Sequence, residues 1–158
     1  VNDVWGLSRD PDMAKVIADN GAAVIIMHNR ETPDASLDIF EDMRAFFAKA
    51  LEKAQRAGAG KDQIVLDPGI GFGKTLEQNL AILGNLTKLN DYGFPVLLGA
   101  SRKSFINKVS PSGPGERIGG SVVTTVFAAL AGISIVRVHD VAIHTQALKI
   151  VDATGAAD

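Results

Sequence analysis

The sequence contains no cysteine, which excludes a disulfide framework and a thiol nucleophile. It also lacks a long hydrophobic run, because its longest nearly apolar stretch, residues 122–136, is shorter than the roughly 20 residues that a membrane span requires. Excess charge is missing as well, and the formal net charge of −2 argues against a general nucleic-acid binder. No targeting segment is visible. These absences favour a cytoplasmic protein without membrane or nucleic-acid partners.

What the sequence does contain is typical of a single α/β domain covering residues 1–158. Hydrophobic residues make up 46% of the chain and charged residues 22%, so the chain can bury a substantial core. Short apolar runs alternate with longer segments of 3.6-residue period, which is the pattern of repeated β-α units and a parallel sheet. Strands are predicted at Val1–Val4, Ala23–Met27, Ile64–Leu66, Val96–Leu98 and Ile135–Val138.

The segments between these strands carry helix signals. Asp10 and Pro11 predict an N-cap and a first helical position, and Thr75-x-x-Gln78 predicts a capping box at the start of the third helix. The Pro/Gly/Ser loop at residues 110–115 is interpreted as an excursion within the domain, because the β-α rhythm resumes after it. Besides the helix that opens at Thr75, helices are predicted near residues 10–21, 40–58, 101–109, 116–131 and 140–153.

A polar residue lies at or just past the end of each predicted strand. These residues are Asn2, His28, Asp67, Ser101 and His139. A parallel β-α sheet brings the carboxyl ends of its strands to one edge, where ligands bind in both doubly wound folds and barrels. We therefore expect these side chains to converge on one ligand-binding mouth.

The segment DPGIGFGKT, residues 67–75, superficially resembles a phosphate-binding P-loop. A P-loop needs four residues between its first glycine and the Gly-Lys-Ser/Thr, whereas this segment has three, and the position that would give four is a proline without an N–H. Asp67 instead ends an apolar run, where burying a carboxylate is costly unless a group donates to it. The segment therefore predicts an acceptor for a ligand's donors, and we expect Lys74 to matter little to that ligand.

Cationic residues are predicted on the opposite side of the mouth. The run SRKS at residues 101–104 opens a predicted helix, where free N–H groups and the helix dipole favour anions. Arg137 and His139 alternate with valines at the end of an apolar strand, so both point the same way. Together with Arg102 and Lys103 they suit the anionic tail of a flat heterocycle whose donor edge faces the carboxylate.

Several of these residues have a simpler structural interpretation. Asn2 and Asp3 could cap the helix that follows them, and Asp67 could cap the glycine-rich turn. His28 could be an ordinary loop residue instead of a ligand-binding one. His144, four residues into the last predicted helix, is expected to be exposed.

Five motifs occur in a specific order: VNDVWG, IIMHNR, LDPGIGFGK, LLGASRKSF and IVRVHDV. With them the chain resembles dihydropteroate synthase over nearly its whole length. The resemblance implies a partial (β/α)8 barrel in which strands four to eight are present and the first three are missing. It implies a transferase that joins 6-hydroxymethyl-7,8-dihydropterin pyrophosphate to para-aminobenzoate in folate biosynthesis, with sulfonamides competing at the aminobenzoate site. It further implies Mg²⁺, bound mainly through pyrophosphate and a residue of the missing part, and a homodimer formed through C-terminal helices.

The resemblance also implies roles for individual residues. Asp67 would accept hydrogen bonds from the amino group and ring N–H of the pterin, and Asn2 would complete the same edge. Lys103 would bond the far side of the ring, while Arg137 would cover its face and hold phosphate oxygens together with His139. Asp67, Lys103, Arg137 and His139 would thus serve catalysis. The remaining substrate-binding residues would be Met27 in the pterin pocket, Phe72, Arg102 and Ser104 beside the aminobenzoate, and Gly99 and Ser101.

Two alternative functions remain open. One is a pterin-dependent methyltransferase acting on methyltetrahydrofolate, although its substrate has no pyrophosphate and would not require the SRKS and RVHD motifs. The other is a non-catalytic pterin-binding or dimerisation module. We expect the chain to be inactive alone, because the loops that close over both substrates would lie in the missing part. We also expect an open sheet edge where three strands are absent, covered by another chain or by a rearranged segment.

Overall fold

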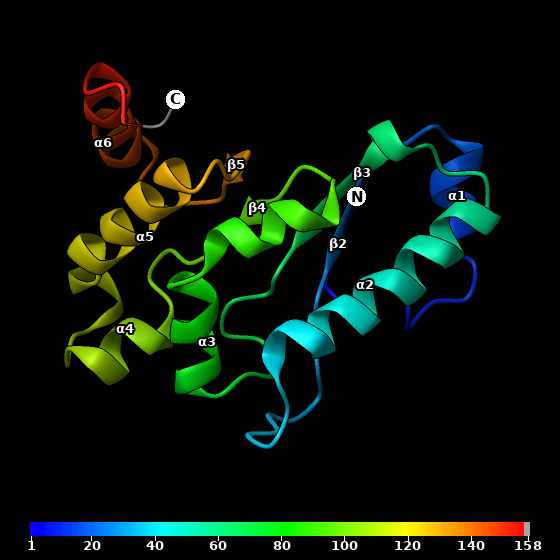
Figure 1. Ribbon diagram of the computed structural model, residues 1–158, viewed down its shortest axis with the longest axis horizontal. Helices are drawn as coiled ribbons and strands as arrows, with labels where there is room; N and C mark the ends of the chain where they lie inside the picture. The colour runs from blue at the N-terminus through cyan, green and yellow to red at the C-terminus, as the bar shows by residue number, and fades with distance from the viewer. Residues whose placement is uncertain (157–158) are drawn as a thin grey trace.

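Figure 1 shows the computed structural model of the chain, which describes residues 1–156. Strands and α-helices alternate along the chain, with three short 3₁₀ helices between them. The strands are β1 (Asn2–Asp3), β2 (Val24–Met27), β3 (Ile64–Asp67), β4 (Leu97–Leu98) and β5 (Ile135–Val136). The α-helices are α1 (Met13–Asp19), α2 (Ile39–Arg56), α3 (Leu76–Leu83), α4 (Ser104–Val109), α5 (Ile118–Leu130) and α6 (Val141–Ala153). The 3₁₀ helices are η1 (Lys61–Gln63), η2 (Leu86–Tyr92) and η3 (Pro114–Glu116).

All strands run parallel and in chain order. β1 pairs with β2, β2 pairs with β3, and β4 pairs with β5. A parallel bridge between Leu66 and Val96 connects β3 to β4 and so joins the two sheets. Within residues 1–156 the strands do not close into a barrel, and β1 and β5 each have a single neighbour. The predicted partial barrel of parallel β-α units is therefore confirmed.

The helices pack their apolar faces on these strands. In α2, Met43, Phe47 and Ala54 are almost completely buried against the strand residues, as the 3.6-residue period requires. The side chain of Asp38 caps the start of α2 by accepting hydrogen bonds from two backbone N–H groups. At the other end of the molecule α6 packs on α5 (Figure 1). Among residues 1–156, no helix is both long and apolar enough to span a bilayer.

Two predicted helix starts are wrong, and one is confirmed. The first helix starts at Met13 with Asp12 at the N-cap position, and the Asp10 carboxylate accepts the Asp12 N–H at 2.8 Å in the turn before it. The helix predicted from Ser101 starts only at Ser104, since Arg102 has a left-handed φ of 57° that a right-handed helix cannot include. The capping box of Thr75 and Gln78 is present.

The expectation that His144 is exposed is also wrong. His144 is buried between α6 and α5, and its Nδ1 lies 2.7 Å from the hydroxyl oxygen of Thr125. The reason is tertiary: the face of α6 that carries His144 packs on α5 instead of facing solvent.

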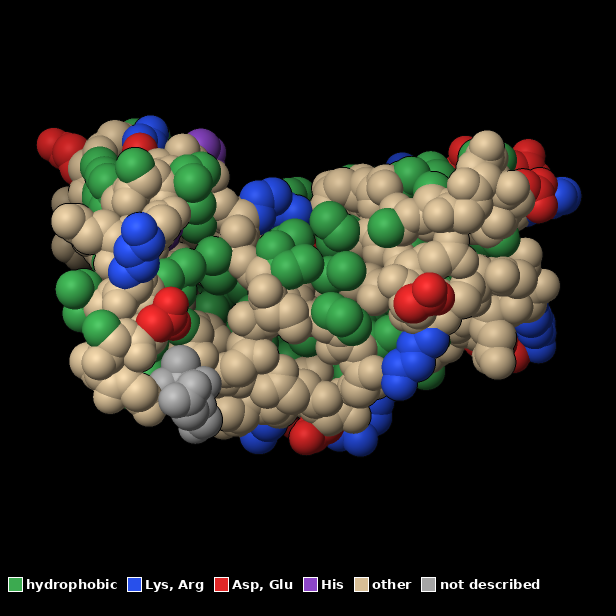
Figure 2. Space-filling view, turned by 90° about the horizontal axis from the view of Figure 1, so that it is seen from above, with side chains coloured by type: hydrophobic (Ala, Val, Ile, Leu, Met, Phe, Trp, Pro, Cys, Tyr) green, Lys and Arg blue, Asp and Glu red, His purple; other side chains and the backbone are tan. Residues whose placement is uncertain are grey.

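The outer side of β5 is the open edge that the sequence predicts. A groove of about 430 Å³ runs along it and is lined by residues of β4, β5 and α6. Ile135 and Val141 beside it are exposed. Figure 2 shows hydrophobic side chains exposed in the central part of the face seen from above, between the C-terminal helices on the left and the α1–α2 end on the right.

Candidate functional site

The carboxylate of Asp67 is the centre of the mouth formed by the strand ends. Asp67 is the last residue of β3, and only 1% of its surface is exposed. Its Oδ1 accepts the backbone N–H of Gly69 at 2.7 Å, and its Oδ2 accepts a hydrogen bond from Arg137 Nη2 at 2.9 Å. Burial raises the pKa of Asp67, and these two donors oppose that shift. One oxygen is thus held by the glycine-rich turn, and the other is available to a cation.

Arg137, which follows β5, also contacts the first strand, β1. Besides its bond to Asp67, it donates from Nη1 to Asn2 Oδ1 at 3.0 Å. Its side chain remains 42% exposed. A Cβ at Gly99 would lie 2.6 Å from Arg137 Nη2, so the absence of a side chain at position 99 makes room for the guanidinium. The structure therefore brings Asn2, Asp67, Gly99 and Arg137 together, and Arg137 contacts the carboxylate directly instead of lying on the opposite side of the mouth as the sequence predicts.

The glycine-rich turn packs closely on the end of β2. Gly69, Gly71 and Gly73 all have positive φ values, which accounts for the glycines. A Cβ at Gly69 would lie 2.0 Å from the carbonyl oxygen of His28. The buried ammonium of Lys74 donates to carbonyl oxygens of the turn and of His28. This lysine therefore has a structural role that the sequence does not predict.

Lys103 lies on the other side of the same turn. Its ammonium donates to the carbonyl oxygen of Ile70 and lies 4.5 Å from the centroid of the Phe72 ring. Burial lowers the pKa of Lys103 to about 8. Phe72 is partly exposed. A cation and an aromatic ring are therefore presented together at the opening of the mouth.

Ser101 and His139 form a second pair at the mouth. The buried hydroxyl of Ser101 lies 3.0 Å from His139 Nδ1 and also accepts the backbone N–H of His139 at 3.3 Å. This contact fixes the loop after β4 to the loop after β5. His139 is exposed, so its ring remains accessible to a ligand.

Three other predicted site residues make no hydrogen bond to the Asp67, Arg137 and Asn2 group. Arg102 forms a bidentate ion pair with Asp140, at 3.0 and 2.5 Å, which directs its guanidinium toward the start of α6. Met27 lies beside Asp67 in the sheet register, but its side chain is fully buried and does not reach the surface of the mouth. Ser104 is exposed at the first position of α4. Their roles as substrate contacts remain predictions.

His28 belongs to a buried polar cluster beneath the mouth. Its Nε2 lies 3.0 Å from Asp42 Oδ2, and Asp42 also accepts hydrogen bonds from Arg30. Burial lowers the pKa of His28 to about 4, so the ring is neutral at neutral pH. The structure therefore favours the structural interpretation of His28 over a ligand-binding one.

Comparison with known proteins identifies the family of the chain. The family model described as pterin binding enzyme matches residues 1–139. The chain belongs to the pterin binding enzyme family. Within this family it is similar to the dihydropteroate synthase of Clostridium beijerinckii, with 42% identity over 153 residues, 96% of this chain and 56% of the relative.

Solved structures of family members have the same fold. The structure of dihydropteroate synthase from Clostridium difficile in the presence of pteroic acid superposes with a TM-score of 0.94 at 48% identity, over 98% of this chain and 59% of that one. A Yersinia pestis dihydropteroate synthase with a pterine-sulfa conjugate gives a TM-score of 0.92 at 38% identity, over 99% of this chain and 60% of that one. The chain thus spans little more than half the length of these pterin binding enzymes.

Proposed function

We propose that this chain is the pterin-binding, C-terminal part of a dihydropteroate synthase. The observation that carries the proposal is the buried Asp67 carboxylate, which lies with Asn2 at the converging strand ends and is paired with a partly exposed guanidinium. A carboxylate in such a position costs free energy unless it has donors, and the donor edge of a pterin supplies them. The similarity to enzymes named dihydropteroate synthase over 96% of the chain supports the same reaction.

The contacts of Arg137 suggest how the pterin is recognised. Its two terminal nitrogens donate to Asn2 and Asp67. The amino group and ring N–H of a pterin form an amidine-like edge with the same pair of parallel donors. The pterin edge takes the place of the guanidinium, which moves onto the ring face, and each charge-assisted bond to Asp67 contributes roughly 1.5–3 kcal/mol.

The displaced guanidinium then serves the chemistry. Arg137 and His139 hold the anionic pyrophosphate while the bond between the pterin methylene carbon and the pyrophosphate oxygen breaks. The amine of para-aminobenzoate attacks the resulting pterin cation, forms the C–N bond and loses a proton. Lys103 bonds the far side of the pterin ring, and Phe72 borders the second substrate, at the position where sulfonamides compete. Electrostatic positioning carries the reaction, and no protein nucleophile takes part.

Magnesium is part of the proposed enzyme, but its ligands are not proposed to come from this chain. Residues 1–156 contain no group of three or more His, Asp or Glu side chains that could hold a metal ion. The Mg²⁺ ion is proposed to bind mainly through pyrophosphate and through a residue outside this chain, and none of the steps above is assigned to it.

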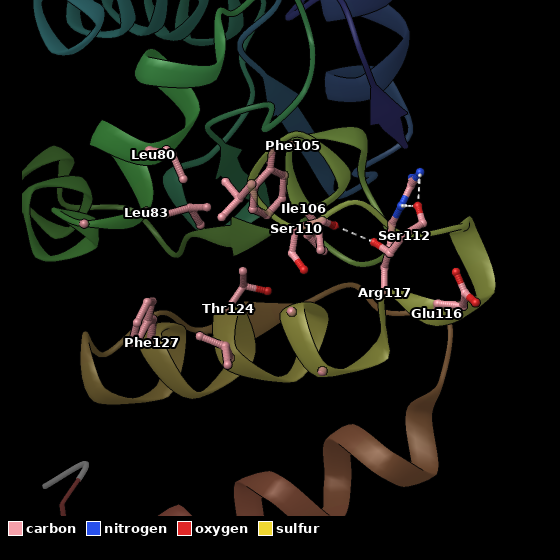
Figure 3. A pocket seen from close by; sticks show the side chains of 15 residues that line it. Leu80, Leu83, Phe105, Ile106, Ser110, Ser112, Glu116, Arg117, Thr124 and Phe127 are labelled. Carbon is pink, nitrogen blue, oxygen red and sulfur yellow. Dashed lines mark hydrogen bonds between the residues drawn. The ribbon is translucent and has the colours of Figure 1, made fainter.

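We also propose that the enzyme is a cytoplasmic homodimer formed through C-terminal helices. A groove of about 550 Å³ lies between α3, α4 and α5. In Figure 3, Thr124 and Phe127 of α5 point toward the apolar side chains of α3 and α4. Val123 and Phe127 are 49% and 48% exposed, and such an apolar face is typical of an interface. Sedimentation of a Phe127→Asp variant tests this, since a dimer through this face should become monomeric.

The proposed reaction is tested by reassembly. The chain is mixed with the N-terminal part of a relative such as the Clostridium beijerinckii enzyme, and dihydropteroate formation from both substrates is measured. We expect activity from the mixture and none from either part alone. Robust turnover by the 158-residue chain alone would contradict the proposal. Pterin binding without turnover in a stable mixture would favour the non-catalytic pterin-binding module instead.

A further inference from the structure

The side chain of Lys74 returns underneath the glycine-rich turn that it ends. Its ammonium donates to the carbonyl oxygens of Gly69 at 3.0 Å and Phe72 at 3.0 Å, both within the turn. A third hydrogen bond, at 3.3 Å, reaches the carbonyl oxygen of His28 just after β2. The residue is 6% exposed. One buried cation therefore satisfies three carbonyl oxygens and joins the turn to a neighbouring strand end.

The contacts of Lys74 lead directly to the acceptor of the site. Gly69 accepts the ammonium at its carbonyl oxygen, and its N–H donates to Asp67 Oδ1 at 2.7 Å. The turn has little room to move, because even a Cβ at Gly69 would collide with the carbonyl oxygen of His28. Phe72 is held at its carbonyl oxygen by the same ammonium. The ammonium thus binds the backbone of the residue that donates to Asp67 and the backbone of Phe72.

A buried lysine needs compensation for its lost hydration. Burial lowers the pKa of Lys74 to about 7, and the negative charge of Asp67 opposes that shift. An apolar side chain could fill the same space without this cost but would leave carbonyl oxygens without donors. A lysine at this position is therefore explained by its hydrogen bonds, which hold the carbonyl oxygens of the turn in place.

We propose that Lys74 is a positioning residue for the pterin site, which fixes the glycine-rich turn on the end of β2 so that Asp67 and Phe72 face the pocket. Lys74 does not itself contact the pterin. The inference depends on the proposed function only for the identity of the ligand, since every contact of the network joins residues of this chain. It replaces the expectation that Lys74 matters little to the ligand.

The first test needs no ligand. Amide hydrogen exchange at Gly69 and Phe72 is compared between the parent chain, Lys74→Met and the control Lys49→Met, which removes an exposed lysine on α2. We expect exchange at Gly69 to accelerate about tenfold or more in Lys74→Met alone, with far smaller changes in the β2 and β3 amides. Unchanged exchange at Gly69 would overturn the proposal. A uniform acceleration over the whole chain would show that Lys74 only stabilises the fold.

The second test uses 6-hydroxymethylpterin as the probe in the reassembled enzyme. Pterin affinity should fall by about tenfold in Lys74→Met and be partly restored in Lys74→Arg, whose guanidinium can also donate to several carbonyl oxygens. If Lys74→Met does not fold, the proposal is tested with Lys74→Arg. The larger guanidinium of this variant should weaken pterin binding, while its melting temperature should stay at the parental value. Parental affinity in a folded variant would overturn the inference. If the parent itself does not bind pterin, the proposed function fails, and the exchange experiment alone decides the role of Lys74.

Discussion

Asp67 and Arg137, separated by 70 positions in the sequence, form a 2.9 Å ion pair across the mouth of the parallel strands. The pair connects the end of β3 to the residue that follows β5, and Asn2 extends it to β1. A buried acceptor is thereby paired with a cationic side chain that is partly exposed. We expect a ligand with matching donors to exchange with the guanidinium at Asp67.

The first prediction concerns Arg137→Ala and separates the two roles of this residue. Removing the guanidinium eliminates a competitor for Asp67 but also removes a contact to the anionic tail. Affinity for 6-hydroxymethylpterin should change by less than about tenfold, whereas affinity for the pyrophosphate ester should fall by more than about tenfold. Calorimetry with both ligands on the reassembled enzyme measures the two effects. An equal loss for both ligands would show that Arg137 does not act on the pyrophosphate.

The second prediction concerns acid stability and His28. Its pKa is lowered from 6.5 to about 4 in the folded chain, so between these values the unfolded chain binds the extra proton. Stability is therefore present above pH 6.5 and is lost as the pH falls toward 4, by about 3 kcal/mol in total for this group. Urea denaturation at several pH values should show a weaker pH dependence in His28→Gln than in the parent. The exposed His139→Gln serves as the control, and parental slopes in both variants would contradict the assignment.

The third prediction tests the packing of the turn. Gly69→Ala introduces a Cβ at a φ of 66° and places it 2.0 Å from the carbonyl oxygen of His28. Strain and displacement together should lower the free energy of unfolding by more than about 2 kcal/mol. Gly115→Ala is the matched control, because nothing lies within 4 Å of its added Cβ. Equal stabilities of the two variants in urea would mean that the turn moves without cost.

Much of the fold and site follows from local patterns in the sequence. Apolar runs predicted the parallel strands, and the polar residues after them predicted a common mouth that includes Asp67 and Ser101. The capping box at Thr75 was recognised because both of its partners lie within one helical turn. Such features depend on neighbours in the sequence, and this is why they could be predicted before the structure was known.

The remaining features depend on partners that are distant in the sequence. Lys74 is buried because carbonyl oxygens of His28 and of the turn surround it, and spacing rules for a P-loop do not test that arrangement. His144 is buried because its helix packs on α5, where Thr125 meets it. Alternation along β5 predicted the side on which Arg137 lies, but not that Asp67 and Asn2 would be its partners.

The central claim is that the buried carboxylate of Asp67 recognises a pterin, and Asp67→Asn tests it most directly. The substitution keeps the size of the side chain but replaces one acceptor oxygen with an NH2 donor that faces a donor of the pterin edge. Isothermal calorimetry of the reassembled enzyme with 6-hydroxymethylpterin should show an affinity lowered by a factor on the order of 10 to 100, with the melting temperature recorded as a folding control. Pterin binding that is indifferent to Asp67→Asn in a folded protein would contradict the account.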